Sequence, residues 1–170
     1  MTRGFLGVAL ASALLLTGTA HAQTKATADL KDAAGKAVGE AVLEQRDGTV
    51  QITATLTGLP PGQHAFHIHE VGKCEAPFDS AGGHFNPTGK HHGKDNPQGP
   101  HVGDLPNLDV PQSGRVKAEI TLKGVTLVDG ANSLLGGNGT SLVVHEKADD
   151  YKSDPAGNSG KRIACGVIHR

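Results

Sequence analysis

The segment Val50-Gln51-Ile52-Thr53-Ala54-Thr55-Leu56-Thr57 alternates strictly between an apolar and a polar residue. A period of two residues is typical of a β-strand, whose successive side chains point to opposite faces of a sheet. One face of such a strand packs on a core and the other faces water. The segment Val116 to Lys123 repeats the pattern, so the sequence predicts two half-buried antiparallel strands.

Turn residues divide the rest of the chain into further short segments of strand-like composition. The turn signals are Gly35, Asp47-Gly48, Pro60-Pro61-Gly62, Ser113-Gly114 and Asp129-Gly130. The further strand candidates are residues 26–30, 37–45, 65–70, 141–145 and 164–168. Many short strands, Gly/Pro turns and no convincing helix predict an all-β fold, an antiparallel Greek-key sandwich or barrel of the immunoglobulin-like kind.

Two long segments, residues 71–111 and 147–162, show neither the two-residue period of a strand nor the 3.6-residue period of a helix. Both are rich in polar and turn-forming residues, and the first also concentrates histidine. Long loops without their own structure are unusual in a compact domain unless something else organises them. The sequence therefore predicts two long functional loops, held by a disulfide and by the histidines.

Residues 1–22 have the pattern of a cleaved secretory signal peptide. Arg3 supplies a positive charge, residues 5–16 are almost all apolar, and Ala20-His21-Ala22 offers small residues for cleavage before Gln23. The apolar run is shorter than the roughly 20 residues that a membrane anchor needs. The mature chain, residues 23–170, is expected to form a single domain.

The overall charge and the cysteines restrict the classes of partner and compartment. The formal net charge is −1, so the global balance does not indicate a nucleic-acid or membrane-surface partner. The chain has two cysteines, Cys74 and Cys165, and export to an oxidising compartment favours a disulfide between them. Free thiols or metal ligands are the alternative, against which stand their wide separation and the lack of a Cys-x-x-Cys pattern.

Histidines are placed at the predicted strand of residues 65–70. His67 and His69 are two positions apart, so their side chains point to the same face, where two imidazoles can bind one metal ion. Their neighbours Phe66 and Ile68 would face apolar packing. His64 does not share this register and is interpreted as structural.

The long irregular loop adds more potential ligands, and another histidine ends a strand. The loop set is His84, His91, His92, His101 and Asp104, and the strand residue is His145. Three nitrogens and one oxygen suit tetrahedral zinc, and a set of imidazoles suits copper as well. The spacing indicates two neighbouring metal sites, but it leaves the metals and the reaction open. A solvated loop that happens to be rich in histidine is the alternative.

The glycine-rich segment Gly136-Gly137-Asn138-Gly139 is interpreted as a turn. A phosphate-binding loop would need a following lysine and helix, which are missing. Asn138-Gly139-Thr140 matches a glycosylation acceptor, and the sequence leaves its use open.

Five motifs together resemble the copper/zinc superoxide dismutase family, in that family's order and spacing. They are HAFHIHE (64–70), SAGGHFNP (80–87), HVGDLPN (101–107), VVHEKADD (143–150) and GKRIACGVI (160–168). The similarity covers nearly all of the mature chain. The resemblance implies an enzyme with one copper and one zinc per subunit that dismutates superoxide, a small anion, to oxygen and hydrogen peroxide. Such an enzyme would protect the cell envelope.

The resemblance also implies a role for each site residue. The copper ligands would be His67, His69, His84 and His145, and the zinc ligands His84, His92, His101 and Asp104. His84 would thus bridge the two ions and act catalytically together with Arg162. Asp149 would bond to one copper and one zinc histidine, and Cys74 and Cys165 would form the family disulfide. His91 lies one position from the family spacing and is interpreted as a neighbour of the ligands.

Departures from the family pattern indicate a branch of the family, and they leave the substrate-guiding residues and the oligomeric state open. Cys74 follows His69 by only five residues, which resembles the bacterial exported branch and implies a periplasmic enzyme. The segment 150–161 is shorter than its animal counterpart, so the family's substrate-guiding charges cannot be carried over directly. The candidates are Lys73, Lys90, Lys94, Lys152 and Lys161. A homodimer is expected, with a monomer as the alternative.

Two other functions compete with the dismutase hypothesis. An exported copper- or zinc-binding protein without enzymatic activity could share the fold, but it should lack a copper ligand or the arginine. A zinc hydrolase needs an open metal position and a general base, and the sequence offers no obvious base beside the site.

Overall fold

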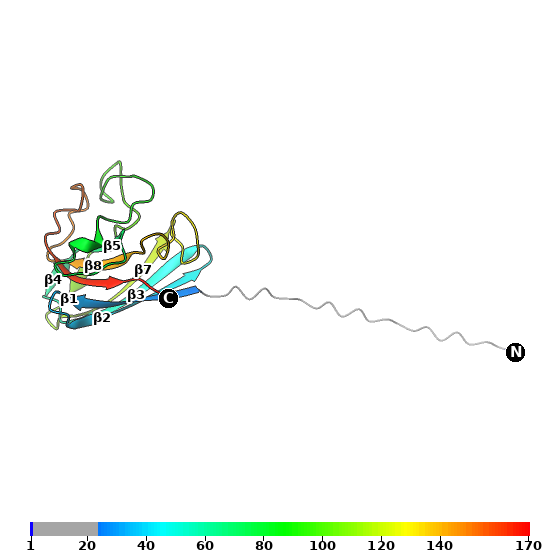
Figure 1. Ribbon diagram of the computed structural model, residues 1–170, viewed down its shortest axis with the longest axis horizontal. Coiled ribbons are helices and arrows are strands. Elements are labelled where there is room, and N and C mark those ends of the chain that lie inside the picture. The colour runs from blue at the N-terminus through cyan, green and yellow to red at the C-terminus, as the bar shows by residue number, and fades with distance from the viewer. Residues whose placement is uncertain (2–23) are drawn as a thin grey trace.

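The computed structural model describes Met1 and residues 24–170, so the predicted signal peptide lies outside the described residues. The strands are β1 (Thr24–Asp32), β2 (Ala37–Arg46), β3 (Thr49–Thr57), β4 (Gly62–His64), β5 (Phe66–His69), β6 (Leu108–Val110), β7 (Arg115–Lys123), β8 (Ser141–His145) and β9 (Arg162–Val167). The one helical element in this part of the chain is a 3-10 turn, η1 (Asp79–Ala81). Figure 1 shows these strands in one layered body with long loops on one side.

A seven-stranded antiparallel sheet carries most of the core, in the order β5-β8-β9-β1-β2-β3-β7. Within β3, Val50, Ile52, Ala54 and Leu56 are buried and the residues between them are exposed or half-buried. This alternation is the one that the sequence predicts, because each apolar side chain reaches the core only from one face of the strand.

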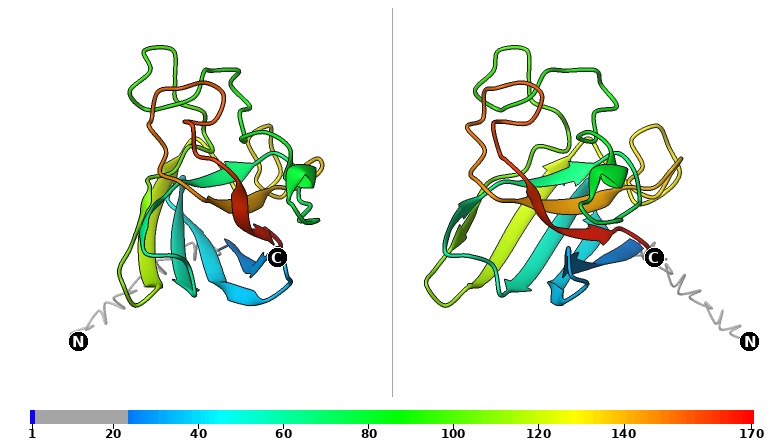
Figure 2. Two further views of the ribbon diagram at one scale, coloured as in Figure 1. Left: turned by 90° about the vertical axis from the view of Figure 1, so that its left-hand side faces the viewer. Right: turned by 60° about the vertical axis from the view of Figure 1, so that its left-hand side comes forward.

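The short ribbon β4–β6 connects the two edges of the large sheet. β4 pairs with β6, β6 lies beside β7, and Ala65 alone separates β4 from β5. The sheet therefore curls round on itself, as both views in Figure 2 show. The predicted all-β antiparallel fold is confirmed.

The sequence analysis missed β4 and β6. Each has three residues, too few to show a period of two. β4 begins at Gly62, the last residue of a turn signal, and β6 lies inside the segment predicted to be irregular. The two strands pair only after folding brings β6 beside β4, and the sequence near each strand does not indicate this partner.

The two long loops lie side by side at one end of the barrel, green and orange-red in Figure 2. They are joined where Asp154 accepts a hydrogen bond from the backbone N–H of His92. The loop after β5 is also fixed to β9 by a disulfide between Cys74 and Cys165. Among residues 24–170 there is no helix with the length and apolar character needed to cross a membrane.

Candidate metal centre

Two buried strands and one loop bring the first histidine cluster together. β5 carries His67 and His69, and β8, which pairs with β5, ends at His145. His84 reaches them from the loop through an isolated backbone bridge with His69. All four side chains are buried, and each offers one ring nitrogen within 4.8 Å of the others.

One ring nitrogen of each histidine in the first cluster points toward the centre of the cluster. His67 Nδ1 and His84 Nε2 are buried and have no hydrogen-bond partner, and His69 Nε2 lies 3.3 Å from His145 Nε2. Buried polar atoms without a partner are rare in folded proteins because they lose their hydration. A cation that accepts four imidazole lone pairs would satisfy all of them, and such a donor set suits copper.

The second cluster surrounds one carboxylate oxygen. Asp104 Oδ1 lies 2.8 Å from His84 Nδ1, 3.0 Å from His92 Nδ1 and 3.2 Å from His101 Nδ1. His92 Nδ1 makes no hydrogen bond despite this short distance. Three imidazole nitrogens and one carboxylate oxygen are a tetrahedral zinc donor set, so the residues present fit zinc.

His84 belongs to both clusters through opposite sides of one ring. Its Nδ1 faces Asp104 and its Nε2 faces the first cluster. One imidazole can therefore contribute a nitrogen to each of two ions.

Asp149 connects the clusters a second time. Its Oδ2 lies 2.8 Å from His67 Nε2, and its Oδ1 lies 2.9 Å from His92 Nε2. The carboxylate thereby fixes both rings with Nδ1 directed into the two clusters, in the way that outer carboxylates orient metal-binding histidines. Burial alone would raise the pKa of Asp149, but the bonds with His67 and His92 outweigh it and hold that pKa well below its usual value.

Burial holds three histidines, His67, His69 and His145, in the neutral form. It lowers the pKa of His67 to about 4, of His69 to about 2 and of His145 to about 3. A neutral imidazole keeps the lone pair that a metal needs. His92 differs: burial lowers its pKa, but the adjacent carboxylates of Asp104 and Asp149 raise it to about 9 in the metal-free protein.

A cavity of about 370 Å³ opens onto the first cluster, with His69, His84, His145 and Arg162 in its lining. The Arg162 guanidinium donates to the carbonyl oxygens of Phe78 and Gly82, both at 2.6 Å. The Gly82 oxygen also accepts a hydrogen bond from His69 Nδ1 at 3.0 Å, so His69 Nε2 is the nitrogen that faces the other rings of the first cluster. The arginine and a candidate ligand therefore share one backbone anchor.

The structure separates His91 and His64 from the clusters. The His91 side chain is 52% exposed and lies 3.3 Å from Asp154, while its neighbour His92 is fully buried between the two carboxylates. His64 has its ring nitrogens 2.8 Å from the His145 carbonyl oxygen and 2.9 Å from that of Pro60. His64 thus has a packing and hydrogen-bonding environment, in line with its structural interpretation.

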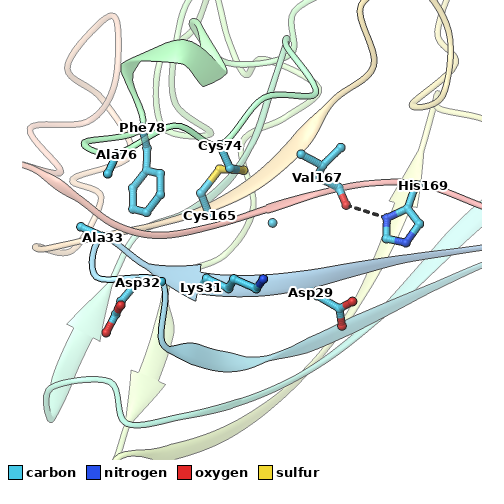
Figure 3. Close-up of a pocket in the computed structure, with 12 residues that line it drawn as sticks. Asp29, Lys31, Asp32, Ala33, Cys74, Ala76, Phe78, Cys165, Val167 and His169 are labelled. Carbon is cyan, nitrogen blue, oxygen red and sulfur yellow. Dashed lines mark hydrogen bonds between the residues drawn. A yellow bond between two sulfur atoms is a disulfide. The ribbon is translucent and has the colours of Figure 1, made fainter.

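A different cavity, of about 430 Å³, lies beside the disulfide between β1 and β9 (Figure 3). Lys31, Asp32, Phe78 and His169 line it together with the two cysteines. No histidine of either cluster is among its described lining residues, so this cavity is separate from the metal centre.

The sequence analysis did not single out four residues that shape this centre. Phe78 acts through its carbonyl oxygen, Asn107 and Tyr151 hold Asp149, and Gly157 leaves room for Asp149 beside His92. Asn107 and Tyr151 lie within or next to the quoted motifs, which was the available signal. Backbone carbonyls carry no side-chain signal at all.

The fold and the clusters define a β-barrel metalloprotein with adjoining nitrogen-rich and mixed nitrogen–oxygen sites. The family model of copper/zinc superoxide dismutase (SODC) matches residues 37–168. The chain belongs to the copper/zinc superoxide dismutase family.

Named relatives support this assignment. Superoxide dismutase (Cu-Zn) 2 of Aquifex aeolicus is 50% identical over 95% of this chain and 96% of the relative. Superoxide dismutase (Cu-Zn) of Caulobacter vibrioides is 42% identical over 84% of each. The crystal structure of a SOD-like protein from Bacillus subtilis is 40% identical, with a TM-score of 0.80 over 83% of this chain and 96% of that one.

Proposed function

We propose that the protein dismutates superoxide, converting two superoxide ions and two protons to oxygen and hydrogen peroxide. The single observation that carries this proposal is the His84 ring, whose two nitrogens face two different donor sets. The reaction is inferred from membership of the family, and the residues proposed for it are those that the fold brings together in the two clusters.

The proposed ligand atoms are ring nitrogens that make no hydrogen bond outside the two clusters. Copper would be held by His67 Nδ1 and by Nε2 of His69, His84 and His145. Zinc would be held by Nδ1 of His84, His92 and His101 and by Asp104. Seven side chains thus provide eight ligand positions, because His84 serves both ions.

Copper when bound supplies the alternation between Cu(II) and Cu(I) that removes an electron from one superoxide and adds one to the next, while zinc supplies a fixed charge. Arg162 binds the anion, since its charge and remaining N–H donors lie at the cavity that opens on the first cluster. His84 Nε2, when free of the metal, would hold a proton and donate it to the peroxide being formed. Asp104 and the second cluster hold His84 Nδ1 in place meanwhile.

Positive charge near the opening would raise the rate at which superoxide arrives, an effect for which superoxide dismutases are a known example. Burial lowers the pKa of Arg162 and the nearby Asp79 opposes that shift. The two carbonyl bonds fix the guanidinium, so it meets the substrate already oriented.

We also propose that residues 23–170 form one exported domain that acts in the periplasm and protects the cell envelope. The disulfide supports this location because such bonds persist in oxidising compartments. The N-terminal signal pattern supports it independently. A homodimer is proposed by resemblance to the family.

The second candidate is a metal-binding protein of the same fold without enzymatic activity. A Bacillus subtilis relative, 44% identical over 79% of this chain, is named only superoxide dismutase-like. Against this candidate, the present chain retains both complete donor sets and Arg162 at the opening.

An assay of superoxide loss separates the candidates. Protein loaded with copper and zinc should remove superoxide catalytically, whereas protein loaded with zinc alone should not. Stoichiometric loss, limited to one equivalent per bound copper, would favour the metal-binding candidate and refute the dismutase proposal.

A further inference from the structure

We propose that Tyr151 is a positioning residue that holds Asp149 between the two metal sites and thereby sets the affinity of the zinc site. The inference rests on the proposed function, since it takes the two clusters to be metal sites. Tyr151 is the only tyrosine of the chain.

Tyr151 contacts Asp149 directly through its backbone. The Tyr151 N–H donates to Asp149 Oδ1 at 2.6 Å, and this same oxygen lies 2.9 Å from His92 Nε2. The oxygen that orients a zinc-side histidine is therefore itself placed by Tyr151. A change in the backbone at residue 151 would move the carboxylate and, with it, both rings that it holds.

The Tyr151 hydroxyl completes a clasp around Asp149 through Asn107. The backbone N–H of Asn107 donates to this hydroxyl at 2.8 Å. The Asn107 side chain accepts from the Asp149 N–H at 2.8 Å and donates to the Asp149 carbonyl oxygen at 3.0 Å. The Tyr151 hydroxyl thus positions Asn107, which in turn makes two hydrogen bonds with the backbone of Asp149.

The same tyrosine is fixed to the loop that carries His92. Its carbonyl oxygen accepts the Asp95 N–H at 3.0 Å and lies against Gly93, where an added Cβ would collide with it. Lys94 Nζ lies 3.9 Å from the centre of the Tyr151 ring, in a cation–π contact. Gly93 in turn donates its N–H to the zinc-side carboxylate of Asp104 at 2.9 Å.

The backbone conformation of Tyr151 indicates that these contacts are specific. Its φ is 61°, in the left-handed region that is unfavourable for a residue with a Cβ. Glycine or asparagine would adopt this conformation more readily. A bulky tyrosine at such a position is explained by the contacts of its hydroxyl and ring.

The test measures zinc affinity in copper-free protein by competition with a chromogenic chelator. Tyr151→Phe removes only the hydroxyl and leaves the Asn107 N–H without its acceptor, so zinc should bind about 5- to 10-fold more weakly. Thr121→Val is the matched control, because Thr121 lies on the remote strand β7 and loses only an exposed side-chain hydrogen bond to Gln51 on β3. Its zinc affinity should equal that of the unsubstituted protein.

A double-mutant cycle separates positioning from general packing. In an Asp149→Ala background no carboxylate remains to be placed, so adding Tyr151→Phe should change zinc affinity less than about twofold. If that background does not fold, Asp149→Asn takes its place with the same expectation. An equal loss in both backgrounds, or no loss from Tyr151→Phe alone, would overturn the positioning role.

This result is independent of catalysis. A protein that shows the coupled zinc affinities but does not remove superoxide would support the positioning role and refute the proposed function. A protein that removes superoxide but shows no coupling would do the reverse.

Discussion

Gly157 lies where the long C-terminal loop passes over the bridge between the two sites. Its φ is +64°, and an added Cβ would collide with Asp149 Oδ1 and lie 2.7 Å from His92 Nε2. Gly157→Ala should therefore disturb the carboxylate that links the clusters. The left-handed backbone costs alanine about 1–2 kcal/mol. Displacing a buried, charged hydrogen bond adds about 1.5–3 kcal/mol.

Gly35→Ala is the matched control for this substitution. Gly35 has a similar φ of +82°, but an added Cβ there meets nothing within 4 Å. It should lose only the backbone part, about 1–2 kcal/mol. Urea unfolding of the metal-free variants should thus show Gly157→Ala to be less stable than Gly35→Ala by at least about 1.5 kcal/mol.

Metal binding provides a second readout for the same pair. Gly157→Ala should weaken zinc binding about 10- to 100-fold, in the range seen when outer partners of metal ligands are lost. Gly35→Ala should leave zinc affinity unchanged. Equal stability and equal zinc affinity in the two variants would refute the role assigned to the Asp149 bridge.

Three further outcomes are expected. His84→Ala should uncouple the sites, so that zinc no longer alters the copper absorption spectrum; an unchanged zinc dependence of that spectrum would count against a shared ligand. Arg162→Glu should lower kcat/KM and weaken its dependence on ionic strength, and stopped-flow rates matching the unsubstituted protein at every salt concentration would remove Arg162 from the mechanism. Burial lowers the pKa of His67 to about 4, of His69 to about 2 and of His145 to about 3. As the pH falls below about 6.5, the unfolded metal-free chain therefore binds more protons at these residues than the folded chain does. These three groups should therefore lower its unfolding free energy by about 4 kcal/mol between neutral pH and pH 5.5, and a flat urea-midpoint profile over that range would contradict these protonation states.

Much of the fold follows from local pattern. The alternation at residues 50–57 predicts a half-buried strand, and β3 buries its apolar face and no other. The short strand pair β4–β6 does not follow, because a three-residue ladder depends on a partner distant in the chain.

The site divides in the same way. The period of two residues is enough to place His67 and His69 on one face of a strand, and the family motifs assign a role to His84. Those roles remain predictions, while the fold determines which side chains meet. The choice between His91 and His92 depends on which ring the loop turns inward, and Asp149 and Asp154 on a distant segment determine that. Local sequence contains no record of such long-range contacts.

The contacts of Tyr151 are beyond local prediction for a related reason. They join residues 93–95, residue 107 and residue 149, which only the folded loops bring together. A tyrosine in a polar loop follows no periodic pattern that would indicate these contacts.

Whether one ring is shared by two ions can be decided by a crystal structure of the fully metallated protein with anomalous data at the copper and zinc absorption edges. We expect a copper peak beside His84 Nε2 and a zinc peak beside His84 Nδ1, both within coordinating distance of the same imidazole. Two peaks that are not joined by the His84 ring, or a single metal occupying both positions after loading with both ions, would contradict the shared ligand.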